Sequence, residues 1–87
     1  RGICLREWVY FIGAEDGSVK IGKSINVPKR LRSLQTSTAG ALRVLGQVDA
    51  ALYSERRVHS QFRHLRLRGE WFRDAPDLAS FIREHGQ

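Results

Sequence analysis

Four polar residues of different chemistry occur where packing alone would not place them: Tyr10, Lys20, Arg30 and Glu55. A guanidinium forms paired hydrogen bonds with phosphate oxygens, and a carboxylate holds a metal ion or another cation. A phenol close to an ammonium gives up its proton more readily than a phenol in water. Brought together, the four side chains would bind an anion and support proton transfer beside it.

Glu55 is the least expected of the four. One helix face is predicted to carry Ala51, Glu55, Val58, Phe62 and Leu65. Burial of a bare carboxylate in such an apolar stripe is unfavourable unless a cation or several donors meet it. The partner is either Arg30, in a structural ion pair, or a metal ion. His59 lies one turn on, where it could orient Glu55, contact a phosphate, or pack as an ordinary histidine.

Tyr10 and Lys20 lie in two consecutive apolar runs. Lys20 faces away from Val19 and Ile21, so in a hairpin it could lie beside Tyr10 on one face of the sheet. A nearby ammonium would lower the tyrosine pKa from its reference value of about 10. A core tyrosine and a solvated lysine are the plain alternatives. Arg30 borders the apolar stripe of a following helix, where its stem could simply pack on the surface.

The elements that position these residues begin with a hairpin. Residues 8–12 are aromatic and β-branched, residues 13–17 are turn material, and residues 19–22 alternate, which is typical of two strands around an Asp-Gly turn. A helix follows, capped by Ser24 or Asn26. Beyond it we expect a loop over residues 35–40 and a third strand over residues 42–48. A longer helix over residues 49–65 is capped by Asp49, and a last helix over residues 74–82 begins at Asp74 or Pro76.

The predicted order is β-β-α-β-α-α. It gives one α/β (α+β) domain over residues 1–87, with its core in residues 8–82 and a small three-stranded antiparallel sheet flanked by helices. Trp71 and Phe72 are expected to pack in that core rather than stack on bases.

The charge of the chain favours nucleic acid as a partner. It carries 15 Lys and Arg against nine Asp and Glu, a net charge of +6, and 12 of the 15 are Arg. A basic surface attracts a phosphate backbone, although a merely solubilising face is the alternative. The candidates for phosphate contacts are Lys23, Arg56, Arg57 and Arg63, and we expect binding to weaken steeply with salt.

Several protein classes are disfavoured. No apolar run approaches the roughly 20 residues of a membrane span, and no apolar signal segment follows a basic start. Cys4 is the only cysteine, which excludes a disulfide-rich secreted scaffold and favours an intracellular, cytoplasmic setting. The chain starts at Arg1 without a methionine, as an excised domain or a processed product would.

Short motifs occur in a fixed order along residues 8–82. They are Val9-Tyr10, Lys20-Ile-Gly22, Arg30, Leu34-Gln-Thr36, Glu55…His59…Phe62 and Gly69-Glu-Trp-Phe72. This ordered set resembles the GIY-YIG nuclease superfamily, and most closely its branch of phage proteins and fungal "meiotically up-regulated" proteins. Two departures from the wider superfamily are Lys20, in place of the second tyrosine, and Trp8, in place of the first glycine. Glu70 falls near a late asparagine of that superfamily, as a helix-end partner or a second acid near the site.

The resemblance implies a metal-dependent endonuclease that hydrolyses phosphodiester bonds in DNA. Glu55 would hold one Mg²⁺ or Mn²⁺ ion, and Arg30 would bind a phosphate oxygen. Tyr10, close to Lys20, would act as general base or orient the attacking water, with His59 assisting proton transfer. Specificity would come from a fused domain or from dimerisation, because so small a nuclease offers little surface for base readout. RNA is an alternative substrate.

Two interpretations from other functional classes stay open. A nucleic-acid-binding module with the same fold would bind without cleaving, and the replacement of the second tyrosine by Lys20 keeps this alternative open. A protein-interaction domain, whose arginines only keep it soluble, requires Glu55 and Arg30 to form an ordinary ion pair.

Overall fold

The structure is a computed structural model that describes residues 5–87. Cys4, the single cysteine behind the expectation of no disulfide, lies outside the described residues. The elements in chain order are β1 (Trp8–Ala14), β2 (Ser18–Ser24), α1 (Val27–Gln35), β3 (Leu42–Asp49), α2 (Glu55–Gln61), the 3-10 turn η1 (Arg63–Leu65), β4 (Arg66–Arg68), β5 (Trp71–Arg73) and α3 (Pro76–His85).

The strands correct the fold predicted from the sequence. The predicted three-stranded sheet is wrong: five strands form one antiparallel α+β sheet in the order β3-β1-β2-β5-β4, and the element order is β-β-α-β-α-β-β-α. The missed strands, β4 and β5, have three residues each and meet at a turn in which Gly69 has a φ of 53°. Three residues are too few to reveal alternation, and every residue of β4 is exposed, so no apolar pattern marks it.

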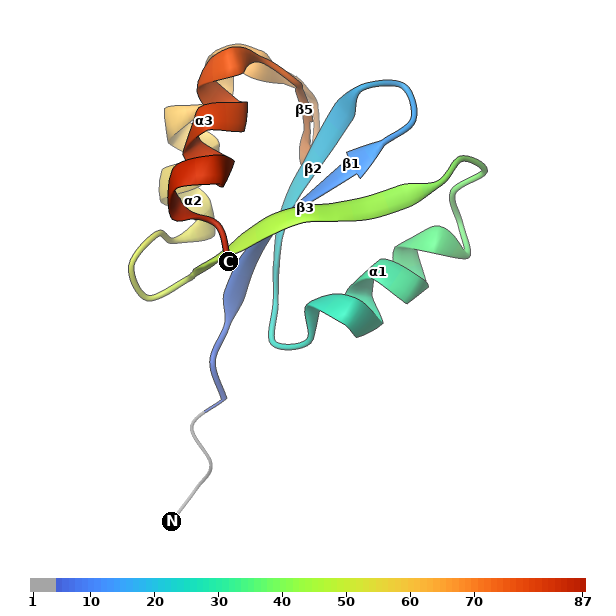
Figure 1. Cartoon of the computed structure of the whole chain (residues 1–87), viewed down its shortest axis with the longest axis horizontal. Coiled ribbons are helices and arrows are strands. Elements are labelled where there is room, and N and C mark those ends of the chain that lie inside the picture. The colour runs from blue at the N-terminus through green and yellow to red at the C-terminus, as the bar shows by residue number, and fades with distance from the viewer. Residues whose placement is uncertain (1–4) are drawn as a thin grey trace.

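Different helices cover the two faces of the sheet, with α2 and α3 on one side and α1 on the other (Figure 1). The larger core, between the sheet and α2 and α3, contains Val9, Phe11, Val19, Ile21, Val48, Val58, Phe62, Leu65, Phe72, Leu78 and Phe81. The smaller core, under α1, contains Tyr10, Ile12, Val27 and Leu42. Because side chains alternate along a strand, β1 contributes to both cores.

The register of the hairpin places Tyr10 and Lys20 on the same face. Tyr10 lies opposite Gly22 of β2 and Gln47 of β3, whereas Lys20 lies opposite Ile12. Since Ile12 and Tyr10 share the core under α1, Lys20 projects toward that side as well. The shared facing predicted from alternation is therefore present in the structure.

Helix α1 begins as its sequence indicates. Asn26 is the N-cap, and its side-chain oxygen accepts a hydrogen bond of 3.1 Å from the backbone N–H of Lys29. Pro28 occupies the first turn, where its missing N–H costs no helical bond. Val27 is buried and Leu31 and Leu34 are partly buried, so this face of α1 packs on the sheet.

Helix α2 begins later than predicted. Asp49 ends β3, and its backbone carbonyl accepts hydrogen bonds from the N–H groups of Leu52 and Tyr53 in a turn. Ser54 is the N-cap of α2 and accepts a hydrogen bond of 3.1 Å from Arg57 N–H. The predicted helix over residues 49–65 is therefore wrong at its start. Ala51 lies exposed in the turn and does not share a stripe with Glu55.

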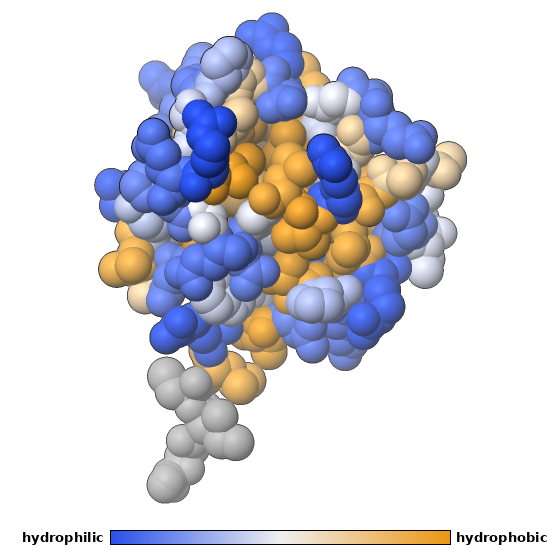
Figure 2. Space-filling model, in the orientation of Figure 1, coloured by the Kyte–Doolittle hydropathy of each residue, from blue (hydrophilic) through white to orange (hydrophobic). Residues whose placement is uncertain are grey.

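The surface is polar over most of its area, with an apolar band between α1 and α3 in the face shown (Figure 2). Among the described residues, exposed large apolar side chains are Leu5, Ile25, Val44, Leu52 and Leu67. Within residues 5–87 no helix has both the length and the apolar character that crossing a membrane requires.

Candidate active site

The hydroxyl of Tyr10 is buried and has no hydrogen-bond partner among the described residues. An unpaired buried hydroxyl costs about 1–3 kcal/mol, so such a group calls for an explanation. The absence of a side chain at Gly22 makes room for it. A Cβ atom at position 22 would overlap Tyr10 Oη and lie 2.5 Å from its Cζ. The glycine of the Lys-Ile-Gly motif therefore lets the phenol lie against the backbone of β2.

Substitution Gly22→Ala is expected to lower the free energy of unfolding by about 1–3 kcal/mol, because overpacking forces a buried ring from its preferred position. Urea unfolding followed by circular dichroism measures this loss. The loss should shrink in a Tyr10→Leu background, since leucine lacks the Oη, Cζ and Cε1 atoms that the new methyl group would meet. An equal loss in both backgrounds would mean that the phenol is not what fills the space over residue 22.

Charged side chains from three other segments act on Tyr10. Burial raises the pKa of its phenol above the ordinary value of 10.0, the Arg30 guanidinium opposes that rise, and the carboxylates of Glu70 and Glu55 add to it. Arg30 comes from α1, Glu55 from the first turn of α2 and Glu70 from the turn between β4 and β5. The charges of all three side chains therefore act on the phenol. Arg30 does so at a geometry short of a hydrogen bond.

The direction of this pKa shift corrects the sequence-based expectation. Lys20 was expected to lower the pKa of Tyr10, but burial raises it and Arg30 is the cation that opposes the rise. The ammonium of Lys20 instead lies 3.3 Å from Glu70 Oε1 and 5.4 Å from the centre of the Trp71 ring. Desolvation outweighs the opposing charge because the tyrosine side chain is fully enclosed by the sheet and α1. The phenol is therefore neutral at pH 7.

The raised pKa of Tyr10 predicts a loss of stability at alkaline pH. Below pH 10 the phenol is protonated in both states and its contribution is intact. As the pH rises through the folded pKa, the unfolded chain has already lost its proton, so unfolding becomes more favourable. The free energy of unfolding of the wild type should fall relative to Tyr10→Phe by up to about 1.4 kcal/mol per pH unit in that window. Parallel curves for the two proteins from pH 9 upward would contradict it.

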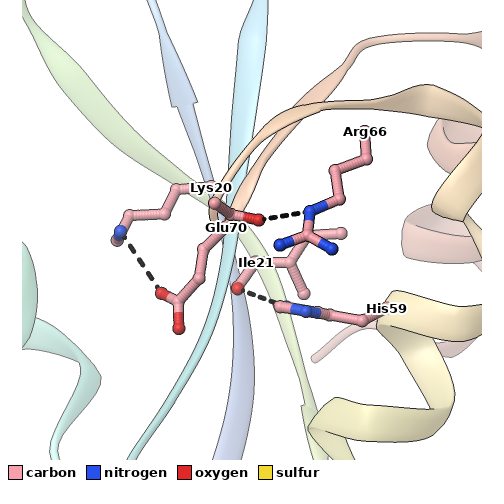
Figure 3. Close-up of polar contacts among 6 residues, drawn as sticks. Lys20, Ile21, His59, Arg66 and Glu70 are labelled. Atoms are coloured by element: carbon pink, nitrogen blue, oxygen red, sulfur yellow. Dashed lines mark hydrogen bonds and ion pairs between the residues drawn. The ribbon is translucent and has the colours of Figure 1, made fainter.

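Glu70, in the turn before β5, contacts two neighbouring residues of β2, Lys20 and Ile21 (Figure 3). Its carboxylate pairs with Lys20, and its backbone carbonyl accepts a hydrogen bond of 2.9 Å from Ile21 N–H. The ladder between β2 and β5 reaches only to the Lys20–Trp71 pair, so this bond is the last that joins the two segments. From Gly22 onward, the side of β2 that faces away from β1 has no strand partner among the described residues.

His59 takes the place of a strand partner at this edge. Its Nε2 lies 2.8 Å from the carbonyl oxygen of Ile21, and its ring packs edge-on against Phe72 with centroids 5.0 Å apart (Figure 3). A carbonyl only accepts hydrogen bonds, so Nε2 carries the proton and donates it. In this arrangement Nε2 cannot serve as a base, and the imidazole fixes α2 to β2 one turn beyond Glu55. The proton-transfer role expected for His59 has no support in this geometry.

Glu55 is a half-buried carboxylate without an ion pair among the described residues. Of the two partners considered for Glu55, the structural ion pair with Arg30 is therefore not formed. As the first residue of α2, Glu55 also interacts favourably with the helix dipole, by about 0.3–1 kcal/mol. Within residues 5–87 no group of three or more His, Cys, Asp and Glu side chains is arranged to hold a metal ion. A single free carboxylate suits Mg²⁺, which keeps several waters and takes further oxygens from a phosphate.

The four predicted phosphate contacts are all exposed. Arg57 is partly engaged, because its Nη1 donates a hydrogen bond of 3.2 Å to the Leu52 carbonyl and its guanidinium lies over the Tyr53 ring. Lys23, Arg56 and Arg63 form no ion pair within residues 5–87. Arg30 also lines a surface hollow of about 400 Å³ together with Ser24, Ile25, Asn26, Lys29 and Ser33.

The comparisons with known proteins place the chain in a family. A family model described as the T5orf172 domain matches residues 7–84, which include every residue of the cluster around Tyr10. No curated protein matches the chain, and no solved structure does.

Proposed function

The chain belongs to the T5orf172 domain family, and from that premise we propose that it is a metal-dependent endonuclease that hydrolyses phosphodiester bonds in DNA through a GIY-YIG-type site. The family is phage-associated and of an endonuclease type, which supports a nuclease or a nucleic-acid-binding role. The charge of +6 and the exposed arginines suit a polyanionic substrate.

One observation carries the proposal: the unpartnered hydroxyl of Tyr10 lies over Gly22, with Arg30 and Glu55 near enough to act on its pKa. Within residues 5–87 the Tyr10 hydroxyl has no hydrogen-bond partner, and neither the Arg30 guanidinium nor the Glu55 carboxylate forms an ion pair. Three such side chains would be a poor way to stabilise a fold. Together they suit a phosphodiester with an attacking water. A purely structural role for these three side chains would require hydrogen-bond or ion-pair partners, which the described residues do not provide.

Each residue has a distinct role in the proposed reaction. Glu55 would hold one Mg²⁺ or Mn²⁺ ion, and that ion would supply Lewis-acid stabilisation of the leaving oxygen. Arg30 binds a non-bridging oxygen of the scissile phosphate and offsets its negative charge. The neutral Tyr10 hydroxyl is enclosed in the free protein, so DNA binding would have to admit the attacking water to it. The hydroxyl would then accept a hydrogen bond from that water and orient it, and Tyr10 would become a general base as the pH rises toward its pKa. Lys20 keeps Glu70 in place beside the phenol.

The proposal is tested by nicking of supercoiled plasmid DNA. The protein is incubated with Mg²⁺, with Mn²⁺, and with each metal plus a chelator, and open-circular DNA is quantified over time. We expect metal-dependent nicking that the chelator abolishes. Nicking that persists with the chelator, or an equal rate in a preparation carrying Glu55→Gln, would point to a contaminating nuclease and against the proposal.

The second candidate function is a nucleic-acid-binding module without cleavage. It is favoured by Lys20, which stands where the resembled superfamily carries a tyrosine and is already paired with Glu70. DNA binding without nicking under any metal condition would select this function. Parallel assays with a single-stranded RNA of the same length would decide between DNA and RNA as the preferred partner.

A further inference from the structure

Arg66 of β4 holds its guanidinium in a defined orientation. Its Nε donates a hydrogen bond of 2.8 Å to the carbonyl of Gly69, across the turn that joins β4 to β5. This bond leaves both Nη groups free, and they form one planar edge of the guanidinium. Arg66 is exposed and forms no ion pair with an acid among the described residues. An oriented, unpaired guanidinium loses little freedom when it binds an oxyanion.

The register of the β4–β5 hairpin places Arg66 on the α2 side of the sheet. Arg66 lies opposite Phe72, and paired residues of antiparallel strands project from the same face. The Phe72 ring packs against His59, which in turn donates to the carbonyl of Ile21, the residue before Gly22. In Figure 3 the guanidinium of Arg66 points toward the hydrogen bond between His59 and Ile21. Arg66 thus lies on the α2 side of the sheet, near the hydrogen bond that joins His59 to Ile21, whereas Arg30 lies on α1.

The plain role for this arginine is protection of a sheet edge. β4 is an edge strand, and charged side chains on edge strands discourage pairing with a second chain. Arg68, two residues along, would serve that role equally well. However, the register shifts between Arg66 and Arg68, which interrupts the alternation of side chains along β4. Arg68 therefore lies opposite Trp71, which packs on the α1 side, and projects from the other face. Both arginines would contribute to protection of the sheet edge, whereas only Arg66 would bind DNA at the site. Substitutions at the two positions therefore distinguish these roles.

From these contacts we propose that Arg66 is a second phosphate-binding residue of the site and holds the DNA backbone next to the scissile phosphate. This inference rests on the proposed function and adds a substrate-binding residue on the opposite side from Arg30. The ligand class is a phosphodiester backbone, recognised by the two free Nη groups of one guanidinium. The residue carries affinity and register and takes no part in the chemical step.

The test measures DNA binding separately from cleavage, in a protein that lacks the proposed metal-binding carboxylate. The Glu55→Gln protein, in buffer with a chelator, is titrated against a labelled DNA duplex by fluorescence anisotropy over a series of salt concentrations. The substitution Arg66→Gln is then introduced into this protein and the titration is repeated. Glutamine is chosen because its amide nitrogen occupies the place of Nε and can still donate a hydrogen bond to the Gly69 carbonyl. We expect the affinity to fall about tenfold and the slope of log K against log salt to decrease by about 0.9, as the loss of one phosphate contact requires.

Arg68→Gln is the matched control, with the same change of charge on the same strand but on the other face. Its affinity is expected to fall less than about twofold. Equal losses for Arg66→Gln and Arg68→Gln would overturn the proposal in favour of diffuse attraction, and unchanged binding in Arg66→Gln would overturn it in favour of an edge-strand role. Since nicking is not measured, absence of cleavage would contradict only the proposed function.

Discussion

Replacement of Glu55 by glutamine is expected to lower metal-dependent DNA nicking by about 100-fold or more while leaving the fold intact. The carboxylate is the only acid of α2, and the described residues offer it no cationic partner. Glutamine keeps the size and the helical position but removes the charge that would hold a divalent ion. Lewis-acid stabilisation is worth several kcal/mol, and each 1.36 kcal/mol corresponds to about tenfold in rate.

Stability provides the internal control for this prediction. Glu55→Gln should change the free energy of unfolding by no more than about 1 kcal/mol, the usual value of a first-turn acid. Glu84→Gln, at an exposed position near the end of α3, is the matched variant and should nick DNA at the wild-type rate. If Glu55→Gln retains more than half of the wild-type rate at saturating Mg²⁺, Glu55 is not the metal-binding residue.

Tyr10→Phe is expected to separate activity from stability. The substitution keeps the ring that fills the space over Gly22 and removes only the unpartnered hydroxyl. Loss of a group that orients or deprotonates water should slow cleavage by about 10²–10⁴-fold. Stability should stay the same or increase by up to about 1–3 kcal/mol, because a buried hydroxyl without a partner is destabilising. Nicking rates and urea unfolding of the same preparations measure both effects.

Tyr53→Phe is the control for the loss of a tyrosine hydroxyl. Tyr53 precedes Glu55 by two residues, but its hydroxyl lies 3.3 Å from His85 Nδ1 of α3. Because that contact joins Tyr53 to α3, the loss of the hydroxyl should leave nicking unchanged. A Tyr10→Phe protein that is less stable than the wild type at pH 7 would contradict the account, because it would mean that the hydroxyl has a structural partner. Cleavage of DNA by Tyr10→Phe at the wild-type rate would also contradict the account.

Much of the hairpin and of α1 could be predicted from the sequence, because their signals are local. The alternation of apolar residues around Lys20 predicts the face of the sheet on which its side chain lies. Asn26 followed by Pro28 predicts where α1 begins. The start of α2 was missed because Asp49 and Ser54 are both good caps, and a run with an exposed Ala51 imitates helical spacing. Only the ladder between β1 and β3 shows that Asp49 still belongs to a strand.

Spacing relative to known motifs drew attention to Tyr10, Arg30 and Glu55, and their role as a site stays a prediction. In the structure the charges of Arg30 and Glu55 act on the pKa of Tyr10. The pKa direction of Tyr10 could not be predicted, since it depends on how deeply α1 buries the phenol and on Glu70 taking up Lys20. Glu70 and Arg66 gain their positions from strands of three residues each, which carry no readable pattern. Short strands that are fixed by tertiary pairing escape prediction from local sequence.

The central claim is that a metal ion and a phosphate meet at Tyr10, Arg30 and Glu55. It is tested most directly by the anomalous scattering of Mn²⁺ in crystals of Tyr10→Phe grown with a short DNA duplex. The account predicts one Mn²⁺ peak within coordination distance of the Glu55 carboxylate, with a backbone phosphate between that ion and the Arg30 guanidinium. A Mn²⁺ ion bound elsewhere on the chain, with DNA contacting neither Glu55 nor Arg30, would contradict it.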